Sequence, residues 1–415
     1  MLLLWEEGVG MTSQQIKIII AGSLAMITVA FATSSVSYFI IPVTEELSIG
    51  RGAFTLHYSI MTIVSTITLP FFSGIIERLG IRKIVFLSGI GLFIGFCVFA
   101  FSHSIWHFYL AAAFIGLFYY ASTTLVALTL INRWFTEKKG IVTGIVMAGS
   151  GIGGVLLGLI IPPILASIDW RTTYVFMGGV MLITTIPSAL FLIKEFPESQ
   201  QSNSSKTLTD NYKVKPRKKR LFCNGTFIFS YVAICFFSIA VSFIQHLPSM
   251  IVGKGFTLTQ AGYLLSILYF SMIFLKIIIG WLTDRLGTKI VLFNICVIYA
   301  LGFMMLPGDF GFLLMSICML VLGVGKSAAT VIFPLYATTI YNVKYFTIIW
   351  GVLGTAITVG NALGSTIWGY VFDIFGKYDC AVMAVAIGII IVGLVLVNFI
   401  KRSEVAIYEN THSHT

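Results

Sequence analysis

Charged residues are scarce in this chain, and the sequence patterns typical of enzymes are missing. Only 10% of its 415 residues are Asp, Glu, Lys or Arg, whereas 58% are hydrophobic. About a quarter of the residues of an ordinary soluble domain are charged, so this composition excludes such a domain. The sequence has no HExxH, nucleophile-elbow or paired-carboxylate pattern. We therefore expect neither an enzyme nor a site for a metal ion or cofactor.

Cysteine is also rare, and none of the six cysteines has the spacing of a disulfide framework or a metal site. They lie singly, nearly all in or beside hydrophobic runs, so we expect them to act as packing residues. The segment Gly149-Ser-Gly151-Ile-Gly-Gly154 matches the GxGxxG pattern of dinucleotide sites. Its surroundings predict a hydrophobic helix and no preceding strand, so we expect these glycines to allow close helix contacts instead.

Long hydrophobic runs dominate what is present. A run of about 20 residues is long enough to cross roughly 30 Å of hydrocarbon. Such runs recur at 16–42, 53–76, 84–102, 105–131, 140–167, 172–193, 222–250, 258–282, 288–306, 310–340, 346–372 and 380–400. We therefore predict an all-α membrane protein with about twelve transmembrane helices, six in each half.

The second half of the chain repeats the first. The phrase Gly74-Ile-Ile-Glu-Arg-Leu-Gly-Ile-Arg-Lys83 recurs as Gly280-Trp-Leu-Thr-Asp-Arg-Leu-Gly-Thr-Lys289. Two similar membrane halves are typical of a transporter whose substrate site lies between them at the bilayer midplane. We predict two pseudo-symmetric six-helix bundles, with a basic linker and a short tail. The predicted boundaries are 1–193 for the first bundle, 194–221 for the linker, 222–402 for the second bundle and 403–415 for the tail.

The net charge of +10 reflects membrane topology. Twenty of the 26 Lys and Arg residues fall in segments on one side of the predicted helices, and the other side has only Arg51, Arg171, Lys254 and Lys377. This positive-inside bias places both termini in the cytoplasm. We expect a multi-pass protein of the plasma (cell inner) membrane that works as a monomer. Its basic residues face the lipid bilayer surface and require no nucleic acid.

Two lysines lie inside predicted membrane helices without an obvious acidic partner. Lys326 lies 17 residues after Asp309, so it is ~25 Å from that end of its helix at 1.5 Å per residue. Lys276 lies eight residues before Asp284, ~12 Å from its helix end by the same rise. A charge at membrane depth costs at least ~2.5–3.5 kcal/mol and normally faces an internal cavity. We predict that both lysines line the path of an anionic substrate.

Further polar residues on the predicted helices are candidates for the same path. Gln245 supplies hydrogen bonds, and His246 is either a titratable substrate contact or a polar residue between helices. The remaining candidates are uncharged polar residues expected to line the cavity: Tyr38, Tyr119, Tyr120, Tyr269, Thr330 and Asn361.

These motifs resemble the major facilitator superfamily over nearly the whole chain. The two copies of G-x-x-x-[DE]-R-x-G-x-[RK] are similar to its signature loops between helices two and three and between helices eight and nine. The segments Arg133-Trp-Phe-Thr-Glu-Lys-Lys-Gly140, Asp169-Trp-Arg171 and Gly369-Tyr-Val-Phe-Asp373 resemble the branch of monocarboxylate transporters and oxalate–formate antiporters. The resemblance implies a two-bundle fold that transports its substrate by alternating access.

The resemblance also implies roles for single residues. Lys276 stands where these carriers have an arginine that pairs with the substrate carboxylate. Met272 stands where the monocarboxylate carriers have an aspartate. The oxalate–formate carriers have a lysine on their eleventh helix, but the corresponding segment here, 346–372, has no charged residue. Lys326 is the candidate substitute for that lysine. The signature loops are expected to hold one gate closed, with Glu77 and Asp284 at helix ends pairing with nearby arginines. The expected gating residues are Gly74, Glu77, Arg78, Gly80, Arg82, Gly280, Asp284, Arg285, Gly287 and Lys289.

These patterns predict a secondary active transporter of a small organic anion, a mono- or dicarboxylate. It would work by anion exchange or by proton symport, and with Met272 in place of an acid, proton movement would depend on a lysine or on His246. The alternative is a proton-coupled exporter of drugs or other hydrophobic solutes. An exporter of cations would carry an intramembrane carboxylate, which the sequence lacks. A sensor would need an output domain and a membrane enzyme would need a set of catalytic residues, and the sequence indicates neither.

Overall fold

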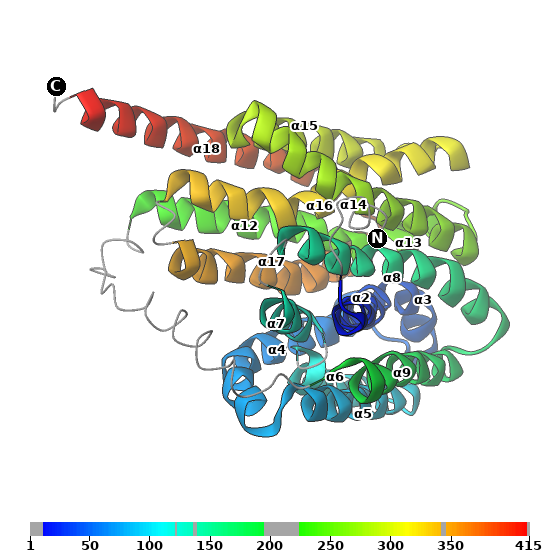
Figure 1. The fold of residues 1–415 in the computed structure, drawn as a ribbon. Coiled ribbons are helices and arrows are strands. Elements are labelled where there is room, and N and C mark those ends of the chain that lie inside the picture. Colours follow the sequence, from blue (N-terminus) through cyan, green and yellow to red (C-terminus); the bar gives the residue numbers. More distant parts are fainter. Residues whose placement is uncertain (1–10, 121–122, 136–138, 195–223, 342–345, 413–415) are drawn as a thin grey trace.

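The structure is a computed structural model that describes residues 11–120, 123–135, 139–194, 224–341 and 346–412. Within these ranges the chain forms helices and no strand (Figure 1). The first half contains α2 (Ser13–Ser34), α3 (Val36–Leu47), α4 (Arg51–Leu79), α5 (Ile81–Ala100), α6 (Ile105–Tyr119), α7 (Thr124–Trp134), α8 (Lys139–Ser167), α9 (Trp170–Pro187) and η2 (Ser188–Leu192). The second half contains α12 (Gly225–Ser242), η5 (Phe243–Gln245), α13 (Leu247–Gly253), α14 (Leu258–Leu286), α15 (Thr288–Met305), α16 (Phe312–Ile340), α17 (Phe346–Phe375) and α18 (Asp379–His412).

The predicted membrane helices are confirmed in the described part of the chain. Eleven helices there are long and apolar enough to cross a membrane. The remaining predicted segment, 346–372, is also helical and forms α17. Two of the predicted spans are broken: α3 follows α2 after Ser35, and α13 follows η5 after His246, with Pro248 in its first turn. A proline at that position costs no hydrogen bond within the helix.

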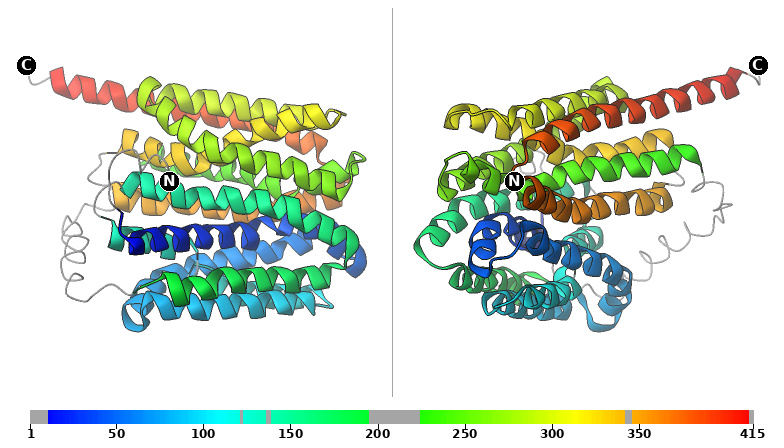
Figure 2. Two further views of the ribbon diagram at one scale, coloured as in Figure 1. Left: turned by 45° about the vertical axis from the view of Figure 1, so that its right-hand side comes forward. Right: turned by 180° about the vertical axis from the view of Figure 1, so that it is seen from behind.

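The long helices lie alongside one another with alternating directions, because short connections join successive helices (Figure 2). We call the end of the bundle at which η2 ends and α12 begins the linker end, and the opposite end the far end. The connections α4–α5 and α14–α15 lie at the linker end. Each of the two repeated phrases runs from the last turns of one helix across the connection into the next helix. Gly80 connects α4 to α5 with φ 79° and ψ 151°, and Gly287 connects α14 to α15 with φ 81° and ψ 152°. A positive φ favours glycine, so the sequence repeat is also a repeat of backbone conformation.

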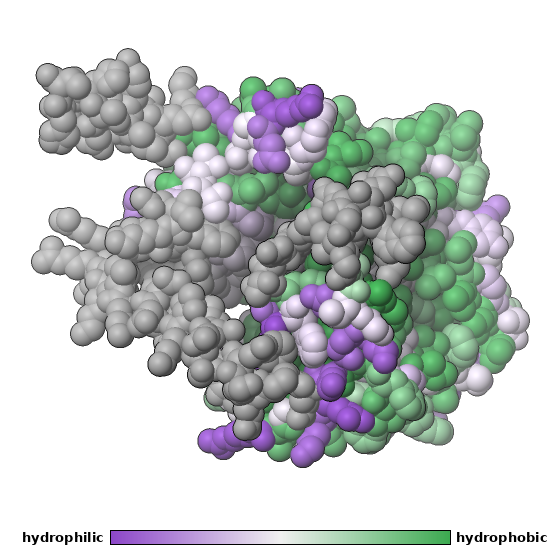
Figure 3. Space-filling view, viewed as in Figure 1, coloured by the Kyte–Doolittle hydropathy of each residue, from purple (hydrophilic) through white to green (hydrophobic). Residues whose placement is uncertain are grey.

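The outer surface is strongly apolar, as a bilayer requires. Large hydrophobic side chains project outward from helices of both halves, among them Ile67, Phe191, Ile277 and Leu313. Hydrophobic residues dominate the right-hand side of the view in Figure 3. A soluble monomer rarely exposes so much contiguous apolar surface, whereas lipid chains cover it without cost.

Candidate functional site

The two halves meet mainly along two pairs of helices, α4 with α17 and α8 with α14, and α3 makes smaller contacts with α13 and η5. Glycines allow the closest contacts toward the far end. A Cβ added at Gly369 would lie 2.6 Å from the Cα of Gly52, and one added at Gly262 would lie within clash distance of the carbonyl oxygen of Gly158. Toward the linker end, a Cβ added at Gly351 would meet no other atom within 4 Å. The glycines in close contact with the other half therefore lie in the middle of the seams and toward the far end, whereas Gly144, Gly280 and Gly351 toward the linker end have no such contact.

Asp373 joins the halves at the far end. Its carboxylate accepts hydrogen bonds from the backbone N–H groups of Arg51 and Gly52, both at 2.8 Å, and so caps the start of α4 from the end of α17. A carboxylate at a helix N-terminus is stabilised by the free N–H groups and by the helix dipole. The Arg51 guanidinium lies 3.4 Å from the centre of the Phe372 ring and donates to the hydroxyl of Tyr378. We call these contacts between the two halves the far-end lock.

The motif Asp169-Trp-Arg171 has a local role in the same region. The Asp169 side chain caps α9 by accepting a hydrogen bond from the backbone N–H of Thr172 at 2.6 Å, which lowers the pKa of this carboxyl group. The Trp170 indole donates to Glu46 at 2.5 Å, and Arg171 forms an ion pair with the same carboxylate. The motif thus ties α9 to the end of α3 within the first half.

A central cavity lies between the halves in two adjoining parts that share Thr33, Tyr58 and Asn361. The smaller part has a volume of about 30 Å³, and its polar lining includes Ser34, Ser242, Gln245, Tyr269 and Lys326. The larger part has a volume of about 130 Å³ and is lined in addition by Tyr119 and Tyr120. Polar side chains of both halves therefore surround one space in the middle of the bundle.

Lys326 lines this cavity, and Lys276 lies outside its lining on the neighbouring helix α14. The Lys326 ammonium lies 5.6 Å from the centre of the Tyr269 ring. Lys276 does not line either part of the cavity and lies on α14 seven residues, about two helical turns, after the lining residue Tyr269. Neither lysine forms an ion pair within the described residues, and the cavity lining contains no carboxylate. The arrangement leaves positive charge available to a bound anion.

Five of the predicted uncharged residues lie in the cavity lining: Gln245, Tyr119, Tyr120, Tyr269 and Asn361. The Gln245 side-chain oxygen accepts a hydrogen bond from Ser365 at 2.5 Å, which fixes its orientation. Tyr38 and Thr330 line neither part. Tyr38 is fully buried, and its hydroxyl has no hydrogen-bond partner among the described residues.

His246 also lies outside the cavity lining, on the far-end side. It is fully buried, and both ring nitrogens have neighbours: the Tyr378 hydroxyl at 3.1 Å and the carbonyl oxygen of Ser365 at 2.8 Å. Tyr378 is also the hydroxyl that Arg51 reaches. The histidine thus belongs to the polar contacts around the far-end lock.

The charged residues of the signature loops that the structure describes have exposed or local surroundings in this conformation. Asp284 is exposed and forms no ion pair with another described residue, and Arg285 lies over the Trp281 ring. Arg82 donates to the carbonyl oxygen of Leu190 in its own half at 3.0 Å. The side chain of Glu77, which we expected to pair with an arginine, lies outside the described residues.

The fold, the apolar surface and the central cavity between two repeated halves define a multi-pass membrane transporter. The chain matches the Major Facilitator Superfamily over residues 22–342 and belongs to that family. It is 24% identical to monocarboxylate transporter 12 of Mus musculus over 380 residues, which cover 84% of this chain and 78% of that protein. It is 23% identical to the uncharacterized MFS-type transporter YcxA of Bacillus subtilis, with 87% and 88% covered. The crystal structure of nucleoside transporter NupG has the same fold, with a TM-score of 0.72 at 15% identity over 94% of this chain and all of that one.

Proposed function

We propose that the protein is a secondary active transporter that moves a small mono- or dicarboxylate across the plasma membrane by alternating access. One observation carries the proposal: Lys326 lies in the cavity lining, Lys276 lies on α14 about two turns after the lining residue Tyr269, and the described lining contains no carboxylate. Two membrane-embedded cations without a protein partner are costly, and a bound anion offsets that cost. Similarity to a protein named monocarboxylate transporter 12 supports the same substrate class.

The uncharged lining suits a carboxylate as well. Each carboxylate oxygen accepts hydrogen bonds, and bonds to an ionised group are the stronger kind. Tyr58, Tyr269, Gln245 and Asn361 present hydroxyl and amide donors around Lys326. The larger part of the cavity, at about 130 Å³, has room for a few heavy atoms, since one water occupies roughly 30 Å³ of liquid. The lack of a lining carboxylate disfavours the alternative, an exporter of cationic drugs.

The difference between the two ends of the seams supports the proposal of alternating access. In this conformation the far-end lock around Asp373 is formed, and the glycines toward the linker end of the seams have no close contact with the other half. We propose that the opposite conformation breaks the lock and brings the two signature loops against the facing half. In that conformation Asp284 and the arginines of the loops would find partners, which makes the ten residues named above gating residues.

Substrate coupling takes one of two forms, anion exchange or proton symport. Met272, one turn before Lys276, is buried and has no titratable group. His246 has both ring nitrogens engaged. Exchange of one anion for another requires no titration, whereas symport requires a lysine or this histidine to carry the proton.

Counterflow in proteoliposomes tests the proposed function. We expect carboxylates loaded inside to drive uptake of a labelled carboxylate, and organic cations of similar size to drive none. Uptake into anion-free vesicles with an inward proton gradient then separates symport from exchange. Selective counterflow of organic cations or of uncharged hydrophobic solutes would support the exporter instead. Gradient-driven uptake that survives Lys276→Arg, Lys326→Arg and His246→Gln alike would exclude all three proton carriers.

The proposed topology places the linker and both termini in the cytoplasm. Cys380 provides a native probe, because it is exposed at the far-end start of α18. We expect a membrane-impermeant maleimide to label Cys380 on intact cells. In a Cys380→Ser background, Ser204→Cys in the linker should react only after permeabilisation. Labelling of Ser204→Cys from outside, with Cys380 protected, would invert the topology.

A further inference from the structure

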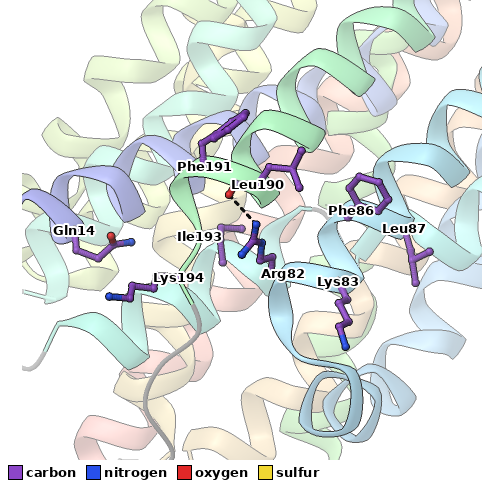
Figure 4. A pocket seen from close by; sticks show the side chains of 9 residues that line it. All are labelled: Gln14, Arg82, Lys83, Phe86, Leu87, Leu190, Phe191, Ile193 and Lys194. Atoms are coloured by element: carbon purple, nitrogen blue, oxygen red, sulfur yellow. Dashed lines mark hydrogen bonds between the residues drawn. The ribbon is translucent and has the colours of Figure 1, made fainter.

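A second hollow lies outside the central cavity, at the linker end of the first half. It has a volume of about 700 Å³ and lies between the start of α2, the start of α5 and the turn η2 (Figure 4). Arg82, Lys83 and Lys194 contribute three positive charges to it, and none of the described residues that line it is acidic. We call it the linker-end groove.

The irregular turn η2 builds the polar side of this groove. It is a five-residue π-helical turn that ends the helix begun by α9, and the last carbonyl groups of a helix have no partner within it. The Leu190 carbonyl accepts a hydrogen bond from the Arg82 guanidinium at 3.0 Å, and the Leu192 carbonyl accepts one from the Gln14 amide at 2.9 Å. Figure 4 shows Arg82 pointing to this turn, with Lys194 and Gln14 on one side of it in this view. The cationic groups thus come from α5 and from the residue that follows η2 by two positions, with Lys83 and Lys194 on opposite sides of Arg82 in this view.

The other side of the groove is apolar and faces outward. Phe86 and Leu87 of α5 and Phe191 of η2 line it, and Leu87 and Phe191 expose 50% and 73% of their surface. Such side chains at a helix end contact lipid chains in a membrane. A ligand that satisfies the whole groove therefore needs an anionic head and an apolar tail.

We propose that the linker-end groove binds one anionic phospholipid. Its phosphate lies among Arg82, Lys83 and Lys194, and an acyl chain runs along Phe86, Leu87 and Phe191. Basic pockets between membrane helices recognise anionic lipid headgroups in this way. A free anion would leave the apolar wall unused, and a neutral lipid would leave the three positive charges without a counter-charge. The bound lipid connects α2, α5 and η2, so it stabilises the first bundle.

Native mass spectrometry of the purified full chain tests the proposal, with phosphatidylglycerol and phosphatidylcholine of the same chain length as probes. We expect one saturable phosphatidylglycerol adduct and much weaker phosphatidylcholine binding. The double variant Lys83→Gln, Lys194→Gln keeps the anchoring Arg82. It should weaken phosphatidylglycerol binding by roughly thirtyfold, since each cation near the surface contributes a similar amount to the free energy of binding an anionic lipid. Lys17→Gln removes an exposed charge from the start of α2, outside the groove, and should leave the affinity within about twofold.

A second measurement keeps the proposal testable if the double variant folds poorly. Phosphatidylglycerol should raise the melting temperature of the wild-type chain, and inorganic phosphate alone should not. Equal binding of the two lipids, or an equal loss in Lys17→Gln and the double variant, would overturn the proposal in favour of general surface attraction. Stabilisation by inorganic phosphate alone would assign the groove to a soluble anion.

Discussion

Lys326→Gln is expected to reduce carboxylate uptake at subsaturating substrate by about thirtyfold or more. Removing one partner of a buried charge pair costs 2 kcal/mol or more, and each 1.4 kcal/mol is a factor of ten. Lys326 is the ammonium that lines the central cavity, so its loss removes the closest charged donor. Glutamine keeps a hydrogen-bond donor of similar length, so the effect reports the charge.

Lys377→Gln is the matched control, because Lys377 is exposed at the far end and lies outside the cavity lining. It should transport at the wild-type rate. Lys326→Arg should retain more activity than Lys326→Gln, since it keeps the charge with a different shape. Wild-type uptake by Lys326→Gln would remove this lysine from the site. For Lys276, which lies outside the cavity lining, we expect a smaller loss than for Lys326.

Gly369→Ala is expected to prevent full closure of the far end. The added Cβ would lie 2.6 Å from the backbone of Gly52, and overpacking of this kind costs about 1–3 kcal/mol. Conformations with the far end separated avoid the clash, so their population should rise by roughly tenfold. A cysteine at Thr33, which lines both parts of the cavity, then becomes more reactive toward an impermeant maleimide from the far side.

Gly351→Ala is the control on the same helix, since a Cβ there meets no other atom within 4 Å. Both variants gain the same helix propensity, so a difference between them reports the contact and nothing else. The assay uses Thr33→Cys in a Cys380→Ser background. Equal labelling rates in the two glycine variants would contradict the assignment of a closed far end.

The fold could be predicted from the sequence because each pattern that indicates it lies within one short segment of the chain. Twenty-residue hydrophobic runs predicted each helix, and the two copies of the signature phrase have nearly the same backbone at Gly80 and Gly287. The position of Lys326 in a cavity lining could be predicted for a similar reason. A lysine far from both ends of a membrane helix normally faces an internal cavity.

The rest of the site depends on contacts between segments far apart in the chain. Asp373 caps a helix more than 300 residues away in the sequence, and no local pattern marks such a cap. Tyr58 lines both parts of the cavity but looks like any packing tyrosine on a hydrophobic helix. His246 stands next to Gln245, yet the short turn η5 directs it to Tyr378 instead of the cavity.

The central claim is that the cavity recognises negative charge. It is tested most directly by equilibrium binding to the purified protein, with short-chain carboxylates each paired with the uncharged amide of the same shape. We predict that at least one carboxylate binds roughly tenfold or more tightly than its amide, and that Lys326→Gln removes the difference. Equal affinity of every carboxylate and its amide, or tighter binding of organic cations, would contradict the proposed anion site.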